Sequence, residues 1–142
     1  MDAWKHSFSE KLAKLQNRWA TQLDEALDAA VTPVFNDLQN FLETNGIRAS
    51  MPLQEEGRRS YKFELAEDAY VLLLFRARGV GEFELTRETF VLGRRPQVRT
   101  VSERIGAVDA AWAEREFQTA LDEFLNGLLG QEAPAEPALS ER

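Results

Sequence analysis

The 142-residue chain contains no cysteine and only one histidine, His6. Without cysteine it can form neither disulfide bonds nor thiolate metal sites. A zinc site would need three or more carboxylates beside His6, a ligand set that zinc rarely accepts. His6 lies near the N-terminus, where the sequence suggests neither a pocket nor an orienting partner, so we interpret it as a surface residue and not as a general base. The sequence therefore predicts no metal, no cofactor and no enzymatic activity.

Long apolar runs are also absent. The longest covers residues 69–75 and suits a buried strand. It is far shorter than the run of about 18 residues that indicates a membrane-spanning helix. The first residues alternate polar and apolar side chains and lack the apolar centre of a secretory signal. We therefore expect a cytoplasmic protein with no membrane partner.

Positive charge is scarce outside the middle of the chain. The net charge is −7, with −3 in residues 1–45, +2 in residues 46–104 and −6 in residues 105–142. An acidic chain repels nucleic acid at long range. Aromatic residues do not alternate with the arginines of the middle section, as they usually do in single-strand binders. We therefore predict no nucleic-acid partner.

The arginines of the middle section fall at the predicted strand ends, where we expect them to pair with acidic helices. Such surface pairs contribute only about 0–1 kcal/mol each. One end of the sheet is predicted to carry Arg58, Arg59, Arg76 and Arg78, and the other Arg94 and Arg95. An anion site at these arginines is the less favoured interpretation. The acidic run of Asp24, Glu25 and Asp28 is likewise interpreted as a solvated helix face.

The first 45 residues show the pattern of a long amphipathic helix. At 100° per residue, the apolar side chains from Trp4 to Ala30 form one stripe. The stripe then shifts by about one residue, next to Thr32 and Pro33. A proline inside a helix costs about 3 kcal/mol and kinks it, whereas Thr-Pro is also typical of the start of a new helix. We predict a kink or break near Pro33, between helices at residues 1–31 and 33–45.

Residues 60–101 show the period of two that is typical of strands, interrupted by short turns. Connections this short favour a four-stranded antiparallel meander. The run at residues 70–75 is apolar on both faces, which predicts a central strand covered on each side. A change of phase before Phe90 predicts a bulge near residues 87–88. Residues 47–59 are predicted to form a loop.

A second helix is predicted over residues 102–129, beginning near Ser102 or Asp109 and packing on the sheet. Residues 131–142, rich in proline and glutamate, are predicted to form a disordered tail. The fold class is therefore α+β, in a single domain over residues 1–130. Its parts are a long N-terminal helix kinked or broken near Pro33, a four-stranded antiparallel meander sheet and a C-terminal helix packed on the sheet. The second face of the sheet is expected to be covered by the helix at 33–45 or by a partner subunit.

The surplus of apolar helix surface is the strongest functional signal. A helix over residues 4–31 is about 42 Å long, whereas a domain of this size is under about 40 Å across. The helix therefore either folds back near Pro33 or projects and packs against another chain. We predict a homo-oligomer, a dimer or larger, that also binds another protein as an adaptor, chaperone-like or assembly component. The predicted partner-binding residues are Trp4, Phe8, Leu12, Leu15, Trp19 and Trp112, the last lying apart from the main stripe of its own helix.

The alternative function is a carrier for a small apolar ligand. Such a protein should be monomeric and hold a cavity of at least about 300 Å³ between the sheet and its helices. The residues predicted to line that cavity are Tyr61, Phe63, Tyr70, Leu72 and Phe83.

Overall fold

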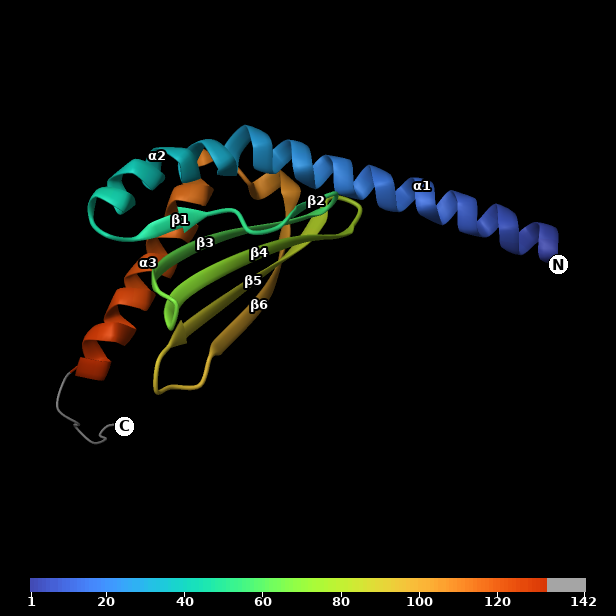
Figure 1. Cartoon of the computed structure of the whole chain (residues 1–142). Helices are drawn as coiled ribbons and strands as arrows, with labels where there is room; N and C mark the ends of the chain where they lie inside the picture. The colour runs from blue at the N-terminus through green and yellow to red at the C-terminus, as the bar shows by residue number, and fades with distance from the viewer. Residues whose placement is uncertain (133–142) are drawn as a thin grey trace.

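The computed structural model describes residues 1–132 and has the predicted α+β architecture (Figure 1). A long N-terminal helical segment lies across one face of an antiparallel sheet, and a C-terminal helix packs on the same face. The greater part of the predicted tail, residues 133–142, lies outside the described residues.

The N-terminal segment is helical without interruption but changes its geometry once. It comprises α1 (Asp2–Ala26), a π-helical turn η1 (Leu27–Val31) and α2 (Thr32–Thr44). A π-helical turn holds one residue more than the corresponding α-helical turn. One extra residue rotates all following side chains by 100°, which explains the shift of the apolar stripe. The predicted irregularity next to Pro33 is confirmed, and its physical form is a π-turn.

The π-turn keeps the apolar side of the helix on the sheet. Leu23, Leu27, Val31 and Phe35 follow one another at intervals of four residues, and all are buried. Pro33 follows the π-turn directly and lies in the first turn of α2. As a result, the segment bends over the sheet as one body (Figure 1).

The sheet has six strands, two more than predicted. The strands are β1 (Arg48–Ser50), β2 (Gln54–Glu55), β3 (Arg58–Ala66), β4 (Ala69–Gly79), β5 (Glu82–Val91) and β6 (Gln97–Arg104). Their order is β1-β3-β4-β5-β6, all antiparallel, and β2 also pairs with β3. The prediction of a loop at residues 47–59 was therefore wrong at β1 and β2. Strands of three and two residues are too short to show a period of two.

β5 is one continuous strand, and the predicted bulge near residues 87–88 is absent from it. Its register with β4 runs unbroken from the pair Ala77–Phe83 to the pair Ala69–Val91, and the shift lies between Ala77 and Gly79. The change of phase in the sequence has another cause, because Phe90 points away from the helices. Its ring lies 5.6 Å from that of Tyr70 on the opposite face.

The helices leave the second face of the sheet uncovered, so the prediction that the helix at residues 33–45 covers it was wrong. The alternative, that a partner subunit covers this face, stays a prediction. On β4 the buried residues alternate with the half-buried Tyr70, Leu72 and Leu74, so only one face is closed. Neighbouring long side chains shield the open face in part. Lys62 is the cross-strand partner of Leu72, and its Nζ lies 4.6 Å from the centroid of the Tyr70 ring. Aliphatic stems of this kind cover apolar surface while keeping their charge in water.

The core lies where the N-terminal segment, the sheet and the C-terminal helix meet. Phe117 places its ring 6.2 Å from Phe35, 5.6 Å from Tyr61 and 5.5 Å from Phe63, in tilted and edge-on geometries. Aromatic pairs favour such arrangements over face-to-face stacking. The Tyr61 hydroxyl and the Thr32 hydroxyl lie 2.8 Å apart in a hydrogen bond, and burial raises the pKa of Tyr61.

The C-terminal helix α3 (Ala110–Glu132) follows a short 3-10 turn, η2 (Ile105–Ala107). The N–H of Trp112 donates a 2.8 Å hydrogen bond to the Asp109 carboxylate, which makes Asp109 the N-cap. Of the two predicted starts, the one near Asp109 is confirmed. The helix continues two residues into the predicted tail.

Candidate functional site

The N-terminal part of α1 extends beyond the sheet (Figure 1). No residue of α1 before Ala20 is buried. Four large apolar side chains on this part remain exposed: Trp4 to 63%, Phe8 to 51%, Leu12 to 37% and Leu15 to 39%. We call these four residues the N-terminal stripe. Of the two sequence-based alternatives, folding back and projecting, the structure has the projecting helix.

The N-terminal stripe has an ordered aromatic end. The rings of Trp4 and Phe8 stack with centroids 5.4 Å apart and an interplanar angle of 24°. Such i, i+4 apolar contacts stabilise a helix only slightly. The single histidine lies elsewhere on the helix, in an exposed pair with Glu10 at 3.4 Å. The projecting helix thus presents a preformed apolar surface.

Trp19 lies where α1 crosses the end of the sheet, and it is half-buried. It borders an open cleft of about 430 Å³ whose other walls include Gly57, Arg58, Arg76 and Arg78. Its indole N–H is buried and has no hydrogen-bond partner within residues 1–132. Trp19 therefore serves the contact between helix and sheet and continues the N-terminal stripe only with its exposed part.

Trp112 was predicted to be a partner-binding residue, and its position corrects that prediction. Only 7% of Trp112 is exposed. Its ring lies 6.2 Å from Phe75 and 5.9 Å from Phe83, both edge-on. α3 packs against both the sheet and the N-terminal segment, so more than one side of this helix is buried. Interpreting its pattern as a single stripe left Trp112 outside the core in error.

Acidic residues of the N-terminal segment attach it to the sheet. Asp28 accepts a 2.6 Å hydrogen bond from the Arg59 guanidinium, whose side chain is only 11% exposed. Asp24 accepts the backbone N–H of Gly57 at 3.2 Å and lies 3.9 Å from Arg59. Asp24 and Asp28 are therefore docking groups, not the purely solvated charge run that the sequence suggested.

The arginines at this end of the sheet lie together, as predicted. Arg58 and Arg76 are cross-strand partners. Their acidic partners, however, come mainly from the sheet and its turn. Arg76 pairs with Glu84 at 3.5 Å, Arg78 pairs with the same carboxylate, and Arg58 lies 3.4 Å from Glu55. The charges of this end are thus largely neutralised within the sheet.

The cavity expected of an apolar-ligand carrier is not formed by the predicted residues. Tyr61, Phe63 and Phe83 are fully buried in the core, whereas Tyr70 and Leu72 lie on the opposite face of the sheet.

Within residues 1–132, no group of three or more acidic or histidine side chains is arranged to hold a metal ion. Nor does the described part of the chain contain a helix long and apolar enough to cross a membrane.

Comparison with known proteins gives no further assignment. No protein-family model matches the chain, and no curated protein or solved structure shows significant similarity to it.

Proposed function

We propose that this chain is a non-enzymatic protein-interaction module that self-associates through the N-terminal stripe, as an adaptor, chaperone-like or assembly component. The observation that supports it is the exposure of Trp4, Phe8, Leu12 and Leu15 on a helix that extends past its own domain. The acidic, cysteine-free composition is compatible with a cytoplasmic location, which belongs to the same proposal.

The exposed surface has the size of the apolar patches that are often functional. A large side chain has on the order of 200 Å² of surface, so the exposed fractions of Trp4, Phe8, Leu12 and Leu15 leave on the order of 400 Å² in contact with water. The largest apolar patch on a typical monomer is about 300–600 Å² and is often functional. Aromatic anchors such as Trp4 and Phe8 also carry much of the binding energy at protein interfaces.

The spacing of the stripe favours a second copy of this chain as the partner. A two-fold symmetric interface must be self-complementary. If two α1 helices pack antiparallel about the point between Lys11 and Leu12, Trp4 of each lies opposite Trp19 of the other, and Phe8 lies opposite Leu15. Large residues thus face large residues along the line of contact between the two helices, which we call the seam. The cleft beside Trp19 lies at the end of this seam, and the proposed pairing brings Trp4 of the second copy next to it.

The charges beside the seam set its salt dependence. Lys11 lies close to the two-fold axis of the antiparallel pair and therefore faces its own symmetry mate. Repulsion between such exposed like charges weakens as salt is added, because the screening length falls from about 10 Å at 0.1 M ionic strength to about 3 Å at 1 M. Self-association is therefore expected to strengthen as salt is raised, as hydrophobic association opposed by like charges does.

Leu12→Glu tests the proposal at the centre of the seam. A buried, unpaired carboxylate costs several kcal/mol, so the variant should sediment as a monomer where the unaltered chain is a dimer. Ala13→Glu is the matched control, because Ala13 is exposed on the opposite side of α1. It should leave the sedimentation coefficient unchanged. Equal behaviour of the two variants would place the contact elsewhere.

A further inference from the structure

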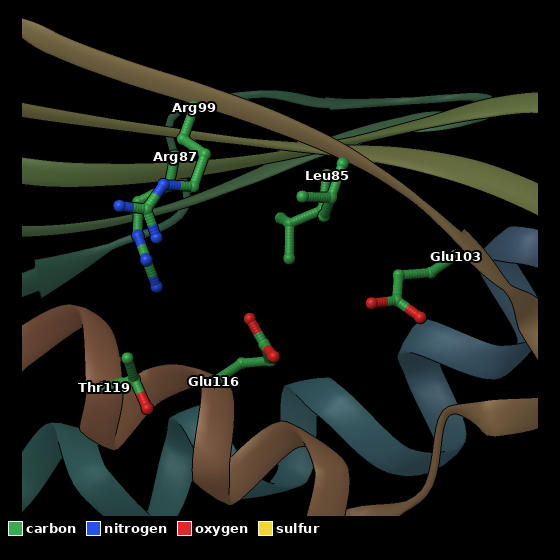
Figure 2. Close-up of a pocket in the computed structure, with 7 residues that line it drawn as sticks. Leu85, Arg87, Arg99, Glu103, Glu116 and Thr119 are labelled. Atoms are coloured by element: carbon green, nitrogen blue, oxygen red, sulfur yellow. The ribbon is translucent and has the colours of Figure 1, made fainter.

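A second hollow lies between α3 and the last two strands, away from the N-terminal stripe (Figure 2). It encloses about 200 Å³. Its lining consists of Leu85, Arg87, Arg99, Val101, Glu103, Glu116 and Thr119, and we call it the β6–α3 cleft. It forms because α3 does not cover the helix-facing side of β6, where Val101 remains 41% exposed.

The floor of the β6–α3 cleft is apolar and its two ends carry opposite charge. Leu85 and Val101 are cross-strand partners and form the floor. Arg87 and Arg99 are also cross-strand partners, two residues along the strands toward one end. Glu103 lies two residues from Val101 in the other direction. Figure 2 shows the two arginines side by side at one end and Glu103 at the other.

At the basic end, the guanidinium of Arg87 is in an ion pair and that of Arg99 is not. Arg87 is only 12% exposed in its side chain and pairs with Glu123 of α3 at 3.0 Å. Arg99 forms no ion pair with any residue in the range 1–132, and it is exposed. A carboxylate entering this end would meet the free guanidinium of Arg99 beside the fixed one of Arg87.

A carboxylate without a partner lies between the two ends. Glu116 points from α3 toward the strands (Figure 2), is half-buried and pairs with no side chain of the described residues. Burial raises its pKa, and repulsion from Glu103 and Glu123 acts in the same direction, while Arg87 and Arg115 oppose it. A cation between Glu116 and Glu103 would relieve that repulsion.

We propose that the β6–α3 cleft binds a small aliphatic zwitterion, with its ammonium group between Glu103 and Glu116 and its carboxylate at Arg99. The four residue steps from Arg99 to Glu103 span about 13 Å of strand, and side chains reaching inward leave room for a short carbon chain over Leu85 and Val101. Pockets for drug-sized molecules hold about 300–1,000 Å³, so a cleft of about 200 Å³ suits an amino-acid-sized ligand. This inference does not depend on self-association.

The probe is 6-aminohexanoate, titrated into the full chain and followed by backbone amide chemical shifts. Hexylamine and hexanoate are the matched single-headed controls. We expect 6-aminohexanoate to bind with a Kd of about 1 mM or lower, with shifts confined to β5, β6 and the first half of α3. Each control should bind at least about tenfold more weakly, because it lacks one of the two charge-assisted contacts.

Two variants separate the ends of the cleft. Glu116→Gln and Arg99→Gln should each weaken 6-aminohexanoate at least about tenfold, whereas Glu114→Gln, an exposed neighbour on α3, should not. Glu116→Gln should not unfold the chain. The pKa of Glu116 is raised in the folded state, so its ionisation at neutral pH opposes folding, and removing the charge should maintain or raise the Tm at pH 7.

Three results would overturn the proposal: single-headed probes that bind as tightly as 6-aminohexanoate, shifts centred outside the cleft, or unchanged affinity in the Glu116→Gln and Arg99→Gln variants. Each can occur whether or not the chain is a dimer, so the outcome is independent of the proposed self-association.

Discussion

Phe35→Ala is expected to lower the free energy of unfolding by about 3–5 kcal/mol, the usual range for truncating a buried phenylalanine. Phe35 is 2% exposed, and its ring lies 5.2 Å from Tyr61, 5.7 Å from Phe63 and 6.2 Å from Phe117. It therefore joins α2 to the sheet and to α3 at once. Chemical denaturation at one fixed protein concentration gives the loss directly.

Phe41→Ala is the matched control for this prediction. Phe41 lies on the same helix but is 63% exposed. Its replacement should change the free energy of unfolding by no more than about 0.5 kcal/mol, as for most surface substitutions. Comparable losses in the two variants would show that α2 does not pack as described.

Gly57→Ala is expected to destabilise the fold strongly, although it adds only one methyl group. Gly57 has φ +73°, and a Cβ at this position would lie 2.8 Å from the Cβ of Ala20 and 3.3 Å from its Cα. The left-handed conformation costs a non-glycine residue about 1–2 kcal/mol, and overpacking adds about 1–3 kcal/mol. Helix α1 would have to move away from the sheet, which would also lengthen the hydrogen bond from the Gly57 N–H to Asp24.

Gly46→Ala separates the two contributions to that loss. Gly46 has φ +86°, but nothing lies within 4 Å of a Cβ built there. Its replacement should therefore show the backbone cost alone, about 1–2 kcal/mol. If thermal or chemical unfolding gave equal losses at Gly46 and Gly57, close packing of α1 on the sheet would be ruled out.

The sequence predicts those parts of the fold that depend on local periodicity. The phase shift beside Pro33 located the π-turn to within a few residues, because one additional residue rotates every later side chain by a known angle. The meander of β3 to β6 followed from alternation and short turns. β1 and β2 exist only through pairing with β3, and no local pattern marks strands so short.

The candidate sites depend more on tertiary packing and were predicted less completely. Trp4, Phe8, Leu12 and Leu15 are exposed on α1, which agrees with their predicted availability. Trp112 is buried, because the pattern of one helix does not show that α3 packs on two neighbours.

The β6–α3 cleft was not recognised from the sequence. Its residues come from two strands and a helix. The available signal was the placement of Arg87, Arg99 and Glu103 at strand positions that face the helix. Charged residues there indicate an opening in the packed layer.

Sedimentation equilibrium of the unaltered chain over a wide concentration range tests self-association most directly. The chain has a mass of 16.1 kDa. The proposed pairing predicts a weight-average mass that rises with concentration to about 32 kDa or more, as expected for a two-fold dimer or a larger assembly. It also predicts that Leu12→Glu remains at the monomer mass. A mass of 16.1 kDa at every concentration, unchanged by added salt, would contradict the proposal.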